Sequence, residues 1–184
     1  MSKHILTYGA IGGVIVVILM FAGQSLMIGP DGQMNFDLGE TLGYVSMIIS
    51  LSVIFFGIKS YRDNKLNGMI TFGNAFKIGI LITLVASLFY VVGWMVYYQT
   101  SDNAAGFLEQ YTEHAVAKME ADGKSLTEIE QFKKDSLEFA EMYKNPFVRA
   151  GVTLVEIFPV GLLISLLSAF ILKQKTDPQH VLHI

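Results

Sequence analysis

Four long runs of apolar residues divide the chain. A helix that crosses a bilayer needs about 20 predominantly apolar residues. The four runs cover residues 5–28, 41–58, 72–98 and 149–172. Gly, Pro, Asn and Asp residues, which break helices and form turns, lie between them. The pattern therefore predicts a polytopic membrane protein of the all-α class.

The first run has one competing interpretation, a secretory signal peptide. A signal peptide has a shorter apolar core, followed by a cleavage site of small residues. Residues 5–28 are uncharged throughout, and Ala22-Gly-Gln-Ser25 is a poor match to such a site. We therefore interpret the run as the first span.

The only long polar segment, residues 101–146, shows helical periodicity in two halves. Ser125 and Glu128 have the spacing of a capping box, which begins a helix. Apolar residues then recur on a broad stripe at Leu126, Ile129, Phe132, Leu137, Ala140 and Tyr143. We predict a four-transmembrane-helix bundle with an external amphipathic helical hairpin between the third and fourth spans, all in one integral membrane domain, residues 1–184.

Composition supports the membrane assignment and excludes several kinds of chemistry. Of 184 residues, 52% are hydrophobic and only 16% are charged, against about 25% in soluble domains. The absence of Cys excludes disulfides, thiolate metal sites and cysteine nucleophiles in this chain. No nucleophile–base pair or metal-ligand set is apparent. We expect no enzymatic activity, no cofactor and no nucleic-acid partner.

Charge asymmetry predicts the orientation. Segment 101–146 carries ten acidic residues and five lysines, and segment 31–40 carries no Lys or Arg. The opposite side carries Lys3, Lys59, Arg62, Lys65, Lys173 and Lys175. Because Lys and Arg accumulate in cytoplasmic loops, we expect cytoplasmic termini, an external hairpin and a bacterial inner membrane.

A candidate cytoplasmic basic site consists of Lys59, Arg62, Lys65 and Lys77. It has the charge to bind anionic lipid, although topology alone demands such residues. Lys77 lies just inside the third span, where a lysine can extend to the headgroups.

Glu156 is the one acidic residue inside the fourth span, and a charge there is expensive. Its helical position places it about 10 Å inside the outer boundary at Arg149. Pro159 removes one backbone donor nearby. Counting along the other spans brings further polar groups to about the same level. The candidate buried polar site is Glu156, Pro159, Tyr90, Tyr44, Ser46 and Gln24.

Two interpretations of Glu156 remain open at this point. It is either a site for a proton, a cation or a polar ligand, or a protonated side chain that joins the helices by hydrogen bonds. Neither Arg149 nor Lys77 is placed to pair closely with it.

Small residues recur at every fourth position in all four spans. This spacing puts them on one helix face and allows close approach of two backbones. The sets are Gly9 and Gly13; Gly39 and Gly43; Ala75, Gly79, Thr83 and Ser87; and Gly161, Ser165 and Ala169.

Three segments together resemble a bacterial family of four-span membrane proteins, domain of unknown function 4199. They are Phe55-Phe-Gly-Ile-Lys-Ser-Tyr-Arg62-Asp63, Thr71-Phe-Gly-Asn-Ala-Phe-Lys77-Ile-Gly79 and Glu156-Ile-Phe-Pro-Val-Gly-Leu-Leu-Ile-Ser165, with Lys144-Asn-Pro146 ending the polar segment. The resemblance covers nearly the whole chain. It implies the same four-span plan and brings no activity.

These observations favour a non-enzymatic accessory or interaction module. Its hairpin would meet the outer leaflet of the lipid bilayer, or a membrane or periplasmic protein. The alternative is a small transporter or channel subunit that uses the polar layer around Glu156. Four helices leave little room for a pathway, so transport would favour a homo-oligomer.

Overall fold

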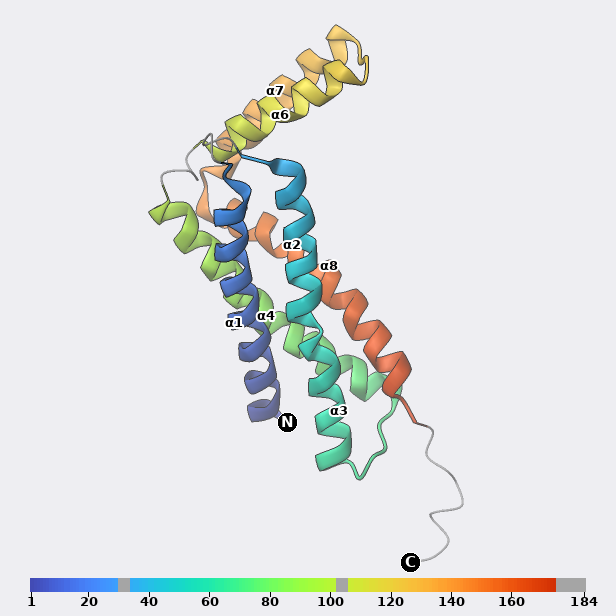
Figure 1. Cartoon of the computed structure of the whole chain (residues 1–184). Coiled ribbons are helices and arrows are strands. Elements are labelled where there is room, and N and C mark those ends of the chain that lie inside the picture. Colours follow the sequence, from blue (N-terminus) through green and yellow to red (C-terminus); the bar gives the residue numbers. More distant parts are fainter. Residues whose placement is uncertain (30–33, 102–105, 175–184) are drawn as a thin grey trace, which may run out of the picture.

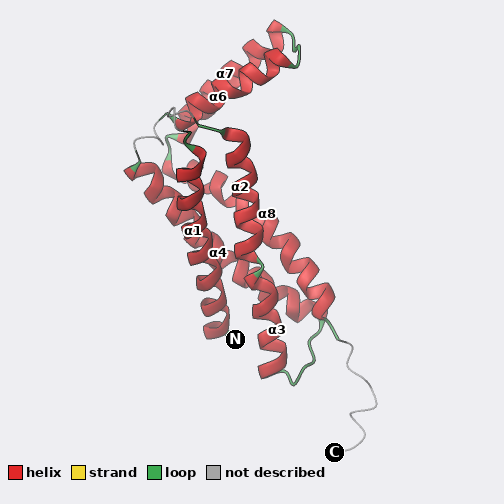
Figure 2. Cartoon of the chain, viewed as in Figure 1, coloured by secondary structure: helices red, strands yellow, loops and turns green. Residues whose placement is uncertain are grey.

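The computed structural model describes residues 1–29, 34–101 and 106–174. Apart from one isolated bridge between Ile28 and Met34, all regular structure in these ranges is helical (Figure 2). The helices are α1 (Ser2–Met27), α2 (Phe36–Leu51), α3 (Val53–Lys65), α4 (Phe72–Thr100), α6 (Phe107–Ala121), α7 (Leu126–Tyr143) and α8 (Pro146–Leu172).

Within the described residues, four stretches are long and apolar enough to cross a membrane: Ser2–Met27, Phe36–Lys65, Phe72–Thr100 and Pro146–Leu172. The prediction of an all-α chain with four membrane-capable helices is thus confirmed. The second stretch is longer than the predicted span of 41–58. It combines α2 and α3, which are separated only by Ser52.

Side-chain caps explain where several helices begin. Asn35, Thr71 and Asn145 each accept a hydrogen bond from a backbone N–H in the first turn of the helix that follows. Pro146 occupies the first turn of α8, where its missing N–H costs nothing. Helices α2 and α8 therefore begin a few residues before the apolar runs that predicted them.

The most extensive helix contact joins α4 to α8. The hydroxyl groups of Thr83 and Ser165 are 3.1 Å apart, and both residues are fully buried. A Cβ at Gly79 would lie 2.8 Å from the Ser165 Cβ, and one at Gly161 would overlap the Thr83 side chain. The predicted small-residue stripes on these two helices therefore form one tight seam.

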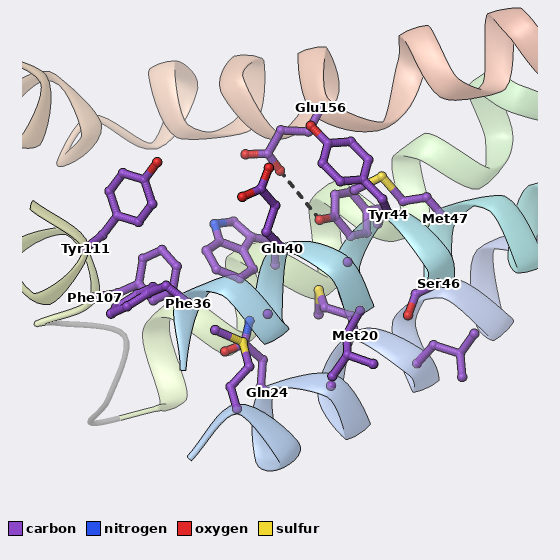
Figure 3. Close-up of a pocket in the computed structure, with 18 of the residues that line it drawn as sticks. Met20, Gln24, Phe36, Glu40, Tyr44, Ser46, Met47, Phe107, Tyr111 and Glu156 are labelled. Atoms are coloured by element: carbon purple, nitrogen blue, oxygen red, sulfur yellow. Dashed lines mark hydrogen bonds between the residues drawn. The ribbon is translucent and has the colours of Figure 1, made fainter. Parts of the chain in front are cut away.

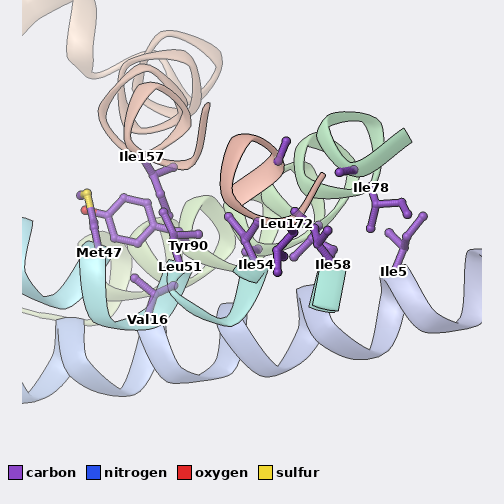
Figure 4. Close-up of a cluster of buried hydrophobic side chains, with 14 of the residues drawn as sticks. Ile5, Val16, Met47, Leu51, Ile54, Ile58, Ile78, Tyr90, Ile157 and Leu172 are labelled. Carbon is purple, nitrogen blue, oxygen red and sulfur yellow. The ribbon is translucent and has the colours of Figure 1, made fainter. Parts of the chain in front are cut away.

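Helix α1 packs against α4 as well, through Gly9 and Gly13. Helix α3 contacts α1, α4 and α8. The buried aliphatic residues gather where these helices meet, among them Leu51, Ile54 and Ile58 (Figure 4).

Helices α6 and α7 lie side by side and extend beyond one end of the bundle (Figure 1). The Ser125 side chain accepts from the Glu128 N–H, and the Glu128 carboxylate accepts from the Ser125 N–H at 3.0 Å. These bonds hold the pKa of Glu128 below its usual range. The predicted capping box is confirmed.

The predicted apolar stripe on α7 is wrong at two positions. Ile129 is only 4% exposed, whereas Leu126 and Leu137 are 79% and 70% exposed. Eleven residues are close to three helical turns, so these two leucines share one face of α7. No other part of the described chain covers that face.

We predict that Gly161→Val weakens the seam by about 1–3 kcal/mol, because the added methyl groups overpack a closed contact. Gly151→Val is the matched control, since a Cβ there meets no atom within 4 Å. Thermal unfolding in detergent checks the pair. Equal melting temperatures for the two variants would contradict the seam.

Candidate functional site

A cavity of about 410 Å³ lies at the hairpin end of the bundle. Helices α1, α2, α4 and α8 form its walls, and residues of α6 and α7 contribute at its outer edge. Five of the six residues of the predicted polar site line it: Gln24, Tyr44, Ser46, Tyr90 and Glu156 (Figure 3). Pro159 is not among the lining residues.

The polar groups are only loosely joined. The Tyr90 hydroxyl donates to Glu156 Oε2 at 3.5 Å, which is long for a hydrogen bond. Gln24 accepts from Tyr97 at 3.2 Å instead of reaching Glu156. The polar residues therefore share a cavity without forming a continuous hydrogen-bonded network in the described residues.

The polar residues that line the cavity are also not all buried within the protein. Tyr44 is 55% exposed and Glu156 is exposed as well. Helix α2 packs mainly on α1 and less closely on α8. The cavity is consequently accessible from the surface of the bundle, and the expectation of complete burial does not hold for these two residues.

Glu40 is a cavity-lining residue that sequence reasoning missed. Figure 3 shows its side chain pointing from α2 toward Glu156 on α8. The apolar run from residue 41 placed Glu40 in a loop, but α2 begins at Phe36. The cap at Asn35 was the signal that could have placed this carboxylate inside the helix.

Aromatic side chains attach the hairpin to the bundle. The Trp94 indole N–H donates to the Tyr143 hydroxyl at 2.7 Å. The Phe36 ring lies against Phe107 and His114 of α6, with centroid distances of 5.6 and 5.4 Å. Burial raises the pKa of the Tyr143 hydroxyl. These contacts fix both hairpin helices at their bases.

Arg149, interpreted from sequence as a boundary residue, is only 6% exposed. Its guanidinium lies over the Tyr98 ring, 3.7 Å from the centroid, and donates to the Lys144 carbonyl at 3.4 Å. Such a cation–π contact is stronger when desolvated. Arg149 is therefore part of the hairpin base, and no ion pair joins it to Glu156 within the described residues.

The predicted basic site lies at the other end of the bundle. Lys59, Lys65 and Lys77 are exposed, and none forms an ion pair within the described ranges. Arg62 donates to Asp63 at 2.7 Å and to the Leu172 carbonyl at 3.4 Å. Arg62 thus connects α3 to the end of α8.

No three His, Asp or Glu side chains come together as a metal site in residues 1–29, 34–101 and 106–174. The cavity instead combines two carboxylates with aromatic and aliphatic walls. Such a lining can hold an apolar body and a charged or hydrogen-bonding group.

A family model described as "Protein of unknown function (DUF4199)" matches residues 7–174. The chain belongs to this DUF4199 family. The resemblance inferred from its three segments is confirmed. Comparisons with curated proteins and with solved structures found no match. Membership in DUF4199 assigns no activity, so function has to be argued from the site.

We predict that Glu156→Leu changes the free energy of unfolding by less than about 0.5 kcal/mol, because the side chain is exposed and makes one long hydrogen bond. Tyr143→Phe is the comparison. It keeps the ring but leaves the Trp94 N–H without its partner, at a cost of about 1 kcal/mol. Thermal unfolding in detergent measures both. A larger loss for Glu156→Leu would restore the interpretation of Glu156 as a structural hydrogen-bonding residue.

Proposed function

We propose that this protein is a non-enzymatic accessory or interaction module of the bacterial inner membrane. Both termini would be cytoplasmic, and the hairpin of α6 and α7 would be a periplasmic arm that binds a partner protein. The charge asymmetry supports this orientation. The end of the bundle at Lys59 and Lys65 is rich in cations, whereas the hairpin segment is acidic overall.

The observation that carries the proposal is the fixed base of the arm. Phe36 packs on α6, and the Trp94 indole N–H donates a hydrogen bond to Tyr143 of α7. Asp37 of α2 also pairs with Lys118 of α6 at 3.3 Å. An arm held from two sides keeps a defined direction relative to the membrane. A fixed arm loses little conformational entropy of its own when a partner binds it.

An exposed face of α7 offers the contact surface. Leu126 and Leu137 lie on the same face of α7, and the described chain covers neither. Spaced apolar anchors on one helix face are what a groove on a partner protein recognises. A partner protein therefore suits this face better than a purely polar ligand does.

The cavity favours a second candidate function, a subunit of a small transporter or channel. Its position among four spans would give a polar species a site at membrane depth. A continuous pathway would then require a homo-oligomer, because the α4–α8 seam is closed by Thr83 and Ser165.

Site-specific photocrosslinking in intact cells tests the proposed arm. A photoreactive side chain at Leu126 or Leu137 should give one discrete adduct. The matched control is Glu113, which is exposed on α6. An adduct at twice 20.4 kDa would identify a second copy as the partner.

The exposed substitution Leu137→Asp should reduce the adduct formed from Leu126 by about tenfold without lowering the melting temperature. The proposal is contradicted if neither leucine position gives an adduct. Equal adducts from Glu113 would also contradict it, because the contact would then have no preferred face.

A further inference from the structure

The cavity at the hairpin end has the size and lining of a small-molecule site. Its volume of about 410 Å³ falls in the range of ligand pockets, roughly 300–1,000 Å³. Most of its wall is apolar, with contributions from Val16, Leu19, Met20, Met27, Met47 and Val152. A ligand that fills it must therefore carry a substantial apolar body.

The polar part of the lining includes two carboxyl groups. Glu40 and Glu156 point toward each other from α2 and α8 (Figure 3). None of the residues that line the cavity is Lys or Arg. Carboxylates within membrane spans normally have a partner of opposite charge. Among the described residues that line the cavity, no cation accompanies this pair of glutamates.

Aromatic rings stand beside these carboxylates. Tyr44, Tyr90 and Trp94 all line the cavity, and their ring faces attract organic cations. A metal ion fits less well, because Ca²⁺ and Mg²⁺ require about six oxygen ligands. Two carboxylates supply at most four oxygen ligands, and no third His, Asp or Glu among the described residues joins them.

Two glycines of the cavity wall have open space beside them. Gly23 and Gly43 line it, and a Cβ added to either would meet no atom within 4 Å. Tyr44 and Glu156 are exposed at its edge, so a ligand can enter without unfolding a helix. This access lies along the apolar surface of the spans, where an amphipathic molecule concentrates.

We propose that this cavity binds an amphipathic organic cation, with the cationic centre between Glu40 and Glu156 and the apolar body against α1 and α2. The site is independent of the proposed partner of the hairpin. It requires neither that arm contact nor transport.

Trp94 provides the measurement, because it is the only tryptophan in the chain and lines the cavity. Tetraphenylphosphonium is the probe, a permanent cation with an apolar body. We expect it to change Trp94 fluorescence saturably in the full-length protein in detergent. Tetraphenylborate has the same shape and the opposite charge, and it should bind about tenfold more weakly or worse.

Substitutions assign the binding to the cavity. The double variant Glu40→Gln, Glu156→Gln should weaken phosphonium binding by about tenfold or more and remove the preference over borate. Glu130→Gln, an exposed acid on α7, is the control and should change neither. Gly43→Phe should fill the cavity and abolish binding of both ions while the melting temperature is kept.

Three results would overturn the proposal. The first is a non-saturable fluorescence change, which indicates partition into detergent. The second is equal affinity for both ions, and the third is unchanged affinity in the double glutamine variant. If Gly43→Phe does not fold, isothermal titration calorimetry on the glutamine variants still decides the question, because these variants keep the size and shape of the native side chains.

Discussion

The close approach of α4 and α8 determines the arrangement of the other helices. Apolar surface gives little driving force for association inside a bilayer, so helices pair where small residues allow tight packing. Gly79 and Gly161 provide the space, and the hydroxyl groups of Thr83 and Ser165 contact each other within it. Helix α1 uses other small residues to join a different part of α4. Helix α2 packs mainly on α1, and the cavity lies between α2 and the α4–α8 pair.

The aromatic residues at the end of α4 link the bundle to the arm. Trp and Tyr favour the membrane–water interface, where an apolar ring can also use its polar group. Trp94 donates to Tyr143 on α7, and Tyr98 lies beneath the Arg149 guanidinium. Both the outer edge of the cavity and the base of the hairpin therefore depend on the same group of side chains. A change in the direction of the arm would alter the mouth of the cavity.

Much of this architecture could be predicted from the sequence. Long apolar runs, and small residues at every fourth position, are compatible with few other structures. The capping box was also predictable, because it involves only Ser125 and Glu128, which are three residues apart. Glu40 was missed because hydropathy does not show that Asn35 starts the helix earlier. The exposure of Leu137 and the burial of Arg149 depend on which neighbours each helix acquires. Periodicity identifies a face but not the element that covers it.

The orientation of the two ends in the membrane is the central claim, since the arm derives its proposed role as a periplasmic partner-binding element from it. The chain has no Cys, so single-cysteine variants give unambiguous labelling. Lys124→Cys lies at the tip of the hairpin, and Asn64→Cys lies at the basic end; both positions are exposed. In intact spheroplasts, a membrane-impermeant maleimide should label Lys124→Cys, and it should label Asn64→Cys only after permeabilisation. The reverse pattern would contradict the account.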